Sequence, residues 1–336
     1  MRKDFALCFN NRYAPYACVT IRSIVESMQK DDDVYIHLVI DKKLSTLSKK
    51  SVKKSAISTS GIKAHVSFYE IGDETVLDTL PKNIIGGWSI AAWYRVLLPQ
   101  LLGKEIHRVL YLDCDVIVND DLDELFTMDI SNKSLGGCVD VFLNYEELVY
   151  KRLRYDKSKR YVCSGVLLLN LDYWRQNNLE KQLLDYAICN VSKLEFFDQD
   201  TINYVCQNSK IILPSKYGVM PQYFTHRPFL EDHLDEIREM IKSPAIIHYA
   251  GCQPWVYSRN KALHSFLWWK HYRGLHQWPE IQVRYIIFFF RHILKTILVK
   301  LKLMKPDADW CRLNFPKIKE MAVLRLLSDI SSGKAN

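Results

Sequence analysis

The alternation of apolar and polar residues along the first part of the chain predicts alternating strands and helices. Short apolar runs, typical of buried strands, cover residues 4–10, 34–41, 64–71 and 108–113. They are separated by a helix at 15–28, a lysine-rich helix or loop at 43–56, and a helix at 89–102 with a break near Pro99. This order is typical of a mostly parallel sheet with helices on both faces.

The second part of the chain continues with shorter elements. The pattern predicts an acidic helix at 120–129, a strand at 135–142, a polar stretch at 144–161, a strand leading into a helix over 163–178, a helix at 196–206, and strands at 210–214 and 245–251. Asp198 is placed as the N-cap of the helix at 196–206. Together these elements indicate an α/β protein without internal repeats.

Composition places the chain among ordinary globular proteins. Its 336 residues are 48% hydrophobic and 25% charged, enough for one large α/β domain or two smaller ones. The 9 cysteines are scattered and form no Cys-x-x-Cys pair, which predicts reduced thiols and a cytoplasmic location. We find no signal peptide, and no segment reaches the roughly 18 uncharged apolar residues that a spanning helix needs.

The net charge of +8 is concentrated toward the C-terminus, where aromatic and cationic residues interleave from about residue 263 onward. Arg284, Arg291, Lys295 and Lys302 recur at helical spacing, which places them on one helix face. The pattern predicts a basic amphipathic helix on an anionic membrane surface, and the alternative is a packed terminal helix with a solvated cationic stripe. Nucleic acid is not expected as a partner, because the cations do not follow a groove.

One apolar strand, within "RVLYLDCDVIV" at 108–118, ends in two aspartates one residue apart. Asp113 and Asp115 project in similar directions from an extended chain, so a proton, a cation or hydrogen-bond donors must relieve their repulsion. Ligands of open α/β sheets bind at the carboxyl ends of strands. Carboxylate oxygens at that edge suit Mg²⁺ or Mn²⁺. We therefore predict a divalent cation that also holds a phosphate-bearing substrate.

Four segments in order resemble glycosyltransferase family 8: "YLDCDVIV", "SGVLLLNLDYW", "DQDTINYV" and "HYAGCQPW". The resemblance runs from about residue 4 to residue 272. It implies a single Rossmann-like domain of the GT-A (nucleotide-diphospho-sugar transferase) fold over 1–275, leaving a basic helical tail over 276–336. It also implies a retaining hexosyltransferase that uses Mn²⁺ or Mg²⁺ and moves galactose or glucose from a UDP-sugar to a lipopolysaccharide, capsular or other glycan or glycolipid acceptor.

The resemblance also assigns roles to individual residues. Asp113, Asp115 and His248 match the metal ligands, while Gln199 and Asp198 match the residues at the reacting sugar. The other donor-binding matches, which accompany Asp113 and Asp115, are Cys8, Asn10, Tyr13, Arg95, Cys114, Asp140, Ser164, Gly165, Gly251 and Gln253. Each of three residues also has a structural alternative. On helix spacing alone, Arg95 is equally compatible with a surface cation. Tyr13 is alternatively an aromatic residue that packs in the core, and His248 a hydrogen-bonded histidine at a strand end.

Three positions depart from the family pattern: Asn10 stands for an aspartate, Cys163 for an asparagine and Gln253 for a lysine. The lost lysine would neutralise diphosphate charge, a task that Arg12 or Arg259 can take over. These changes keep open an alternative, a nucleotide-sugar-binding relative with weak or lost transfer. A sugar-nucleotide pyrophosphorylase is disfavoured, because "FNNRYAPY" after the first strand lacks the glycine-rich loop that grips a triphosphate.

The expected location follows from these inferences: cytoplasmic and peripheral on the inner face of the cell membrane. The acceptor pocket is expected in the loops at 73–88, 144–160 and 217–235. The choice between galactose and glucose, the identity of the acceptor and the oligomeric state stay open.

Overall fold

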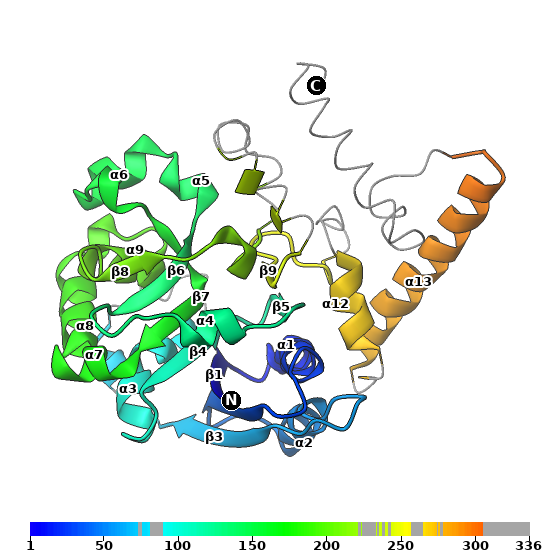
Figure 1. Cartoon of the computed structure of the whole chain (residues 1–336), viewed down its shortest axis with the longest axis horizontal. Coiled ribbons are helices and arrows are strands. Elements are labelled where there is room, and N and C mark those ends of the chain that lie inside the picture. The colour runs from blue at the N-terminus through cyan, green and yellow to red at the C-terminus, as the bar shows by residue number, and fades with distance from the viewer. Residues whose placement is uncertain are drawn as a thin grey trace.

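A seven-stranded sheet forms the centre of the molecule (Figure 1). The computed structural model describes residues 1–72, 76–80, 90–220, 223, 233, 235–236, 239–240, 243–256, 265–273, 275 and 278–304. The strands are β1 (Arg2–Phe9), β2 (Asp33–Asp41), β3 (His65–Ile71), β4 (Arg108–Leu112), β6 (Leu135–Val139), β7 (Val162–Asn170) and β8 (Lys210–Ile212), in the order β3-β2-β1-β4-β7-β6-β8. Within the described residues, β7 alone runs against its neighbours, so the predicted mainly parallel sheet is confirmed.

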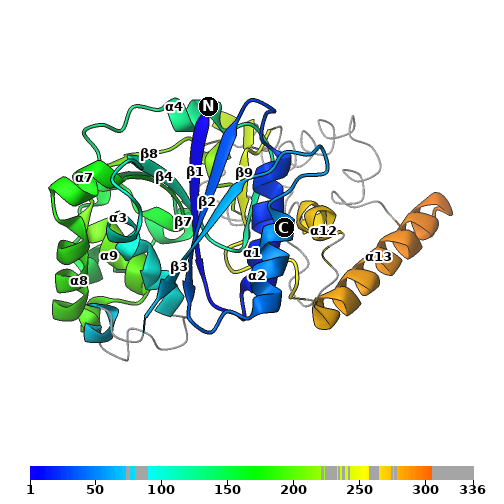
Figure 2. The same cartoon turned by 90° about the horizontal axis from the view of Figure 1, so that it is seen from below.

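Helices cover both faces of the sheet, as Figure 2 shows. One layer holds α1 (Ala14–Glu26), α2 (Thr46–Ser55) and α12 (Ser265–Tyr272). The other holds the 3₁₀ helix η3 (Ile90–Leu97), α3 (Leu98–Leu101), α7 (Leu171–Gln176), α8 (Leu179–Cys189) and α9 (Phe197–Val205). Phe5 and Leu7 of β1 pack toward the first layer and Ala6 toward the second. Burial on both sides explains why this strand is continuously apolar rather than alternating.

A second, two-stranded sheet begins directly after β4. In it β5 (Val116–Val118) pairs antiparallel with β9 (Ile246–His248), and Val116 lies opposite His248. Residues separated by more than 130 positions are thereby brought together at the point where the predicted aspartate pair leaves the main sheet.

The remaining elements are short connections and one long helix. They are η1 (Val76–Thr79), α4 (Asp123–Thr127), α5 (Val141–Asn144), α6 (Glu147–Leu153), η4 (Lys157–Lys159), η5 (Val191–Lys193), η6 (Ser215–Tyr217) and α13 (Pro279–Lys300). Figures 1 and 2 show α13 projecting from the body beside α12. No helix in the described part of the chain combines the length and apolar character required to span a membrane.

Three local predictions were wrong. Residues 90–97 form a 3₁₀ helix, and the α-helix begins only with Leu98 and Pro99, because proline fits a first turn, where no backbone donor is needed. Asp198 is not an N-cap: α9 begins at Phe197 after Phe196, and the Asp198 side chain turns to other partners. Asp140 instead caps α5, accepting a 3.0 Å bond from the Leu143 N–H, which ends the predicted strand at Val139.

Several predictions fall outside the described residues. These are Arg259, residues 305–336 of the tail, and most of the proposed acceptor loops at 73–88 and 217–235.

Candidate active site

The connection between β4 and β5 fixes the two aspartates of the predicted pair. The backbone N–H of Asp113 donates to the Gly165 carbonyl over 2.9 Å, and the Asp115 carbonyl accepts from the Tyr249 N–H over 2.9 Å. Between them, Cys114 turns its buried side chain into the core on the α1 side. The carboxylates therefore face away from that core, and only the backbone of Cys114 remains for donor contacts.

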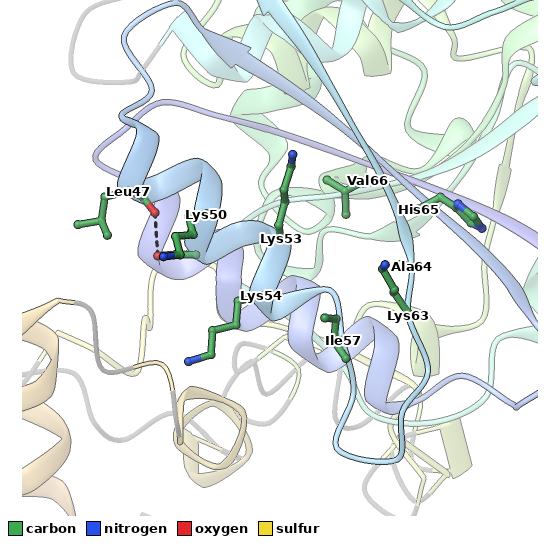
Figure 3. Close-up of a pocket in the computed structure, with 10 residues that line it drawn as sticks. Leu47, Lys50, Lys53, Lys54, Ile57, Lys63, Ala64, His65 and Val66 are labelled. Carbon is green, nitrogen blue, oxygen red and sulfur yellow. Dashed lines mark hydrogen bonds between the residues drawn. The ribbon is translucent and has the colours of Figure 1, made fainter.

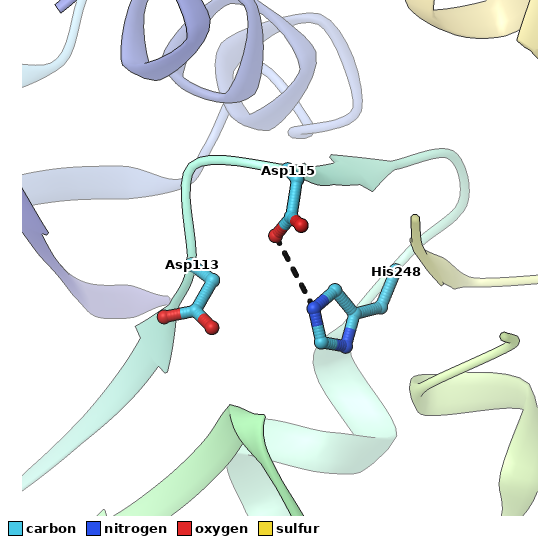
Figure 4. Close-up of side chains that lie close together, drawn as sticks. All are labelled: Asp113, Asp115 and His248. Atoms are coloured by element: carbon cyan, nitrogen blue, oxygen red, sulfur yellow. Dashed lines mark ion pairs between the residues drawn. The ribbon is translucent and has the colours of Figure 1, made fainter. Parts of the chain in front are cut away.

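Asp113, Asp115 and His248 form one cluster (Figure 4). Each offers a ligand atom, and these atoms lie within 4.8 Å of one another. His248 Nε2 is 3.2 Å from Asp115 Oδ1. Burial works to raise the pKa of Asp115, but His248 and a hydrogen bond from Gln253 hold that pKa below its usual value. The predicted ligand set is thus assembled, with Asp115 kept in its anionic form.

The space between these ligands depends on Gly165. A Cβ at this position would lie 2.2 Å from His248 Cε1, 2.7 Å from His248 Nε2 and 2.9 Å from Asp113 Oδ2. Any side chain would therefore occupy the volume that the three ligands surround. Two carboxylates and an imidazole around a space kept clear by glycine fit a divalent cation such as Mn²⁺ or Mg²⁺.

Arg95 is buried beside this cluster, which excludes the alternative of a surface cation. Its Nη2 donates to Asp113 Oδ1 over 3.0 Å, and its Nε lies 3.5 Å from Asp198 Oδ2. The guanidinium lies over the Tyr111 ring at 4.3 Å, and the Tyr111 hydroxyl donates to Asp113 over 2.6 Å. Arg95 also donates to the Ser164 carbonyl. One cation thereby links the metal-ligand cluster to the start of α9.

The side chains of α9 complete this edge of the site. The Gln199 amide oxygen accepts from the Ser164 N–H over 2.9 Å, and its Nε2 donates to Asp140 over 3.1 Å. The Ser164 hydroxyl donates to Asp198 over 3.3 Å. Burial raises the pKa of Asp198 to about 6 and also raises the pKa of Asp140. The predicted sugar-recognition residues therefore form one hydrogen-bonded group next to the metal-ligand cluster.

The first loop lies on the other side of the aspartates. Tyr13 is 41% exposed, and burial together with the nearby Asp115 charge raises the pKa of its phenol. The Asn10 side chain accepts from the Tyr13 N–H over 3.2 Å, which fixes the turn into α1. Cys8 is buried at the end of β1, where its carbonyl accepts from the Cys114 thiol over 4.0 Å. An exposed ring beside two carboxylates is compatible with base stacking.

The loop after β9 contributes Gly251 and Gln253. Gly251 has a φ of 70°, a left-handed conformation that favours glycine. The Cys252 N–H donates to the Tyr249 carbonyl over 2.9 Å, which closes the turn next to Asp115. The Gln253 side chain helps to hold the pKa of Asp115 down, so it lies near the cluster, although without the charge of a lysine.

Sequence reasoning missed the anchor of this site. Asp200 is fully buried and accepts from Arg152 Nη1 over 2.8 Å, from the Tyr161 hydroxyl over 2.7 Å and from the backbone N–H groups of Glu195 and Phe196. These bonds hold the first turn of α9, which carries Asp198 and Gln199. The second aspartate of the Asp-Gln-Asp triplet was the available signal, but nothing in the sequence marks Arg152.

Comparison with known proteins connects this geometry to a family. The model of "Glycosyl transferase family 8" matches residues 4–259. The chain belongs to glycosyltransferase family 8. It is 25% identical over 250 residues to a lipopolysaccharide 1,2-glucosyltransferase of Escherichia coli, covering 73% of this chain and 71% of that protein. It is 24% identical over 268 residues to general stress protein A of Bacillus subtilis (strain 168), covering 76% of this chain and 89% of that protein.

Among solved structures, the family-8 chain resembles the galactosyltransferase LgtC in complex with donor and acceptor sugar analogs. The TM-score is 0.69 at 25% identity, covering 82% of this chain and 98% of that chain. The fold is therefore the GT-A fold of this family, and the chain is a hexosyltransferase. Family membership implies a nucleotide-sugar donor, a glycan acceptor and a divalent metal.

Proposed function

We propose that this hexosyltransferase transfers galactose or glucose, with retention, from a UDP-sugar to a lipopolysaccharide, capsular or related glycan. The observation that carries the proposal is the cluster of Asp113, Asp115 and His248 at the carboxyl end of β4, with Gly165 keeping its centre clear. These residues would hold Mn²⁺ or Mg²⁺. The metal would supply charge stabilisation for the leaving diphosphate. The similarity to lipopolysaccharide glucosyltransferase and to LgtC supports the substrate class.

We assign the sugar end of the donor to the group around Gln199. Its carbonyl and amino ends are both engaged, with Ser164 and Asp140, so the amide is held in one orientation. An amide is a poor nucleophile, which favours attack by the acceptor on the face that UDP leaves. Gln199 and Asp198 would then position the sugar and stabilise positive charge at its anomeric carbon. Asp140, Ser164 and Gly165 line the same edge and would contact its hydroxyls.

The uridine end is assigned to the first loop and the loop after β9. Tyr13 presents an exposed ring for the base, Asn10 accepts from the Tyr13 N–H, and Cys8 lies near the end of β1. Arg95, which is bound to Asp113, would offset part of the negative charge that Asp113 and the diphosphate bring together. Gly251 lets the backbone approach that group closely.

The first test is UDP release from a panel of UDP-sugars with Mn²⁺, with and without EDTA, beside Asp115→Asn. Release from one sugar that requires both metal and Asp115 supports the proposal and names the donor. Metal-dependent UDP binding without release, even when candidate acceptors are added, favours the alternative of a binding protein with lost transfer. The observation behind this alternative is Gln253, which reaches Asp115 but brings no positive charge to a diphosphate.

We also infer that α13 lies on an anionic membrane surface, at the inner face of the cell membrane. Its exposed apolar side chains are Val283, Ile286, Ile287, Phe290, Ile293, Leu294 and Ile297, and the exposed Leu301 follows as its C-cap. At 3.6 residues per turn they cover a continuous stripe of about 120°. Arg291 and Lys295 follow one border of this stripe, as an interfacial helix requires. Lys302 lies beyond the end of α13 with a φ of 61°, so its predicted place on the helix face was wrong.

One cation of the predicted stripe has a different partner. Arg284 Nη1 donates to the Trp255 carbonyl, two residues after Gln253, and Ile281 is buried against the core. The start of α13 is therefore part of the body. The membrane contact that we propose begins beyond Arg284.

A second basic surface, on α2 and the start of β3, supports the proposal that this side of the molecule faces the membrane. A hollow of about 780 Å³ lies between α2 and the start of β3, and Figure 3 shows Lys50, Lys53, Lys54 and Lys63 around it. Residues 42–69 contain no acidic side chain. Because α2, α1 and α12 lie on the same layer, these lysines and α13 are on one side of the sheet. Each lysine near an anionic surface adds about 1 kcal/mol of attraction.

A further inference from the structure

His248 makes a contact on the side of its ring that faces away from the metal-ligand cluster. Its Nδ1 lies 3.5 Å from the Cys163 Sγ, and both side chains are buried. Cys163 is on β7 and His248 on β9, so this contact joins the main sheet to the small one. Among the described residues, Cys163 is the one hydrogen-bond partner of this nitrogen.

The other ring nitrogen faces the space for the cation. His248 Nε2 is 3.2 Å from Asp115 Oδ1 and 2.7 Å from the position that a Gly165 Cβ would take. A histidine that ligates metal through Nε2 carries its proton on Nδ1. The Nδ1–H then points at the Cys163 sulfur, because no carbonyl or carboxylate of the described residues reaches it.

We propose that Cys163 is a positioning residue, which fixes the tautomer and ring orientation of His248 for metal binding. The proposal rests on the metal site proposed above and extends it to a position where this chain departs from the family's asparagine. Metal-ligating histidines usually donate this proton to a carboxylate, a carbonyl or water, and loss of the partner costs 10–100-fold in metal affinity. Sulfur is a weaker acceptor than oxygen, so it holds the ring less firmly.

The competing explanation is that Cys163 only fills space in the core. Valine tests this directly, because it has a similar shape but accepts no hydrogen bond. Serine keeps an acceptor, and Cys163→Asn places the family's amide at the same position. Cys138 is the matched control, since its buried thiol on the neighbouring β6 donates to the Pro214 carbonyl over 3.5 Å and not to the cluster.

The experiment measures Mn²⁺ binding to the full chain in the presence of UDP, by the paramagnetic resonance signal of free Mn²⁺. We expect Cys163→Val to raise the Kd about tenfold or more. Cys163→Ser should stay closer to the native value, and Cys138→Val should leave it unchanged. Ring ¹⁵N shifts of His248 in the Mg²⁺-loaded protein should indicate a single form with its proton on Nδ1 in the native chain, and a mixture of ligated and unligated rings in Cys163→Val.

A Kd within twofold of native for Cys163→Val, or an equal loss for Cys138→Val, overturns the proposal, as does a native chain that binds no Mn²⁺. If Cys163→Val does not fold, Cys163→Ala and Cys163→Ser are compared in its place, and equal Kd values for these two overturn it. Transfer is measured separately. A native chain that binds Mn²⁺ through this arrangement but moves no sugar would sink the transferase proposal and leave the role of Cys163 standing.

Discussion

Arg95 Nη2 binds Asp113 Oδ1 over 3.0 Å inside the protein, beneath the cluster that Asp113 shares with Asp115 and His248. The same guanidinium is 3.5 Å from Asp198, so one buried cation serves carboxylates from two elements. Its burial is compensated by these charges and by the Tyr111 ring. The metal-ligand half and the sugar half of the site are therefore coupled through a single side chain.

Replacing Arg95 should damage both halves together. Arg95→Ala leaves two carboxylates without their cation, which should cost about 3 kcal/mol of unfolding free energy. Arg95→Lys keeps the charge but not the planar fork, so UDP release should fall at least tenfold with a smaller loss of stability. Urea unfolding and UDP release measure the two effects. Lys181→Ala, at the exposed pair with Asp185, is the control and should change stability by less than about 1 kcal/mol.

Gly165 is predicted to be intolerant of any side chain. Gly165→Ala would place a methyl group 2.2 Å from His248 Cε1, so the ring or the ligands must move. We expect Mn²⁺ affinity to fall at least tenfold while circular dichroism stays native. Gly72→Ala is the matched control, since its nearest neighbour is the flexible Lys42 at 3.8 Å. Unchanged Mn²⁺ binding in Gly165→Ala would contradict our view of the metal-ligand space.

The architecture was predictable because the apolar periodicity that defines each strand or helix involves residues close together in the sequence. The apolar runs of β1, β2 and β4 are long and buried on both sides, and the structure places strands where the sequence predicted them. The pairing of β5 with β9, by contrast, joins residues 116 and 248. Only the family resemblance linked His248 to the aspartates, because no local pattern encodes so distant a contact.

The contacts that support the site residues were not predictable. Helix spacing alone left Arg95 equally compatible with a surface cation, because it says nothing of the carboxylates that compensate for the desolvation of its guanidinium. Cys163 was understood only as a lost amide, whereas its sulfur lies against His248. Asp198 follows Phe197, whose φ of 34° is unusual for a side-chain-bearing residue. With Phe197 as the first residue of α9, Asp198 lies inside the first turn, and its carboxylate contacts Ser164 and Arg95.

Arg152 should stabilise the site from a distance. Arg152→Ala leaves Asp200 fully buried without its cation, so we expect a loss of about 3 kcal/mol in unfolding free energy. The first turn of α9 would lose its anchor, and UDP release should fall because Gln199 shifts. Arg152→Ala combined with Asp200→Asn should recover part of the stability, since no uncompensated charge remains. Equal stability of the single and double variants would refute this explanation.

Lys210 should give the protein a pH-dependent stability. Burial lowers the pKa of Lys210 to about 8, and its ammonium contacts the Tyr155 hydroxyl and ring. The unfolded chain then binds more protons than the folded one between about pH 8 and 10.5, so this group makes stability rise with pH across that window. Below pH 8 the full penalty applies, on the order of 3 kcal/mol.

Lys210→Met tests this sign. The variant should be more stable than the native chain at pH 7, and the difference should shrink as the pH rises toward 10. Urea unfolding at several pH values measures it. Lys181→Met, at an exposed lysine, should follow the native curve. A Lys210→Met chain that is less stable at pH 7 would mean that its contacts with Tyr155 outweigh desolvation.

Substitutions at different positions of α13 should separate its membrane contact from catalysis. Leu294 is 57% exposed on the apolar stripe, and Leu301, the C-cap of α13, is 62% exposed; both lie far from Arg284. Leu294→Glu with Leu301→Glu should abolish sedimentation with vesicles of phosphatidylcholine and phosphatidylglycerol, because two charges cannot enter the acyl boundary. UDP release should stay native. Arg284→Ala should do the reverse, keeping vesicle binding while weakening donor binding through Trp255 and Gln253. If the double glutamate variant still sediments, α13 does not bind the membrane through this stripe.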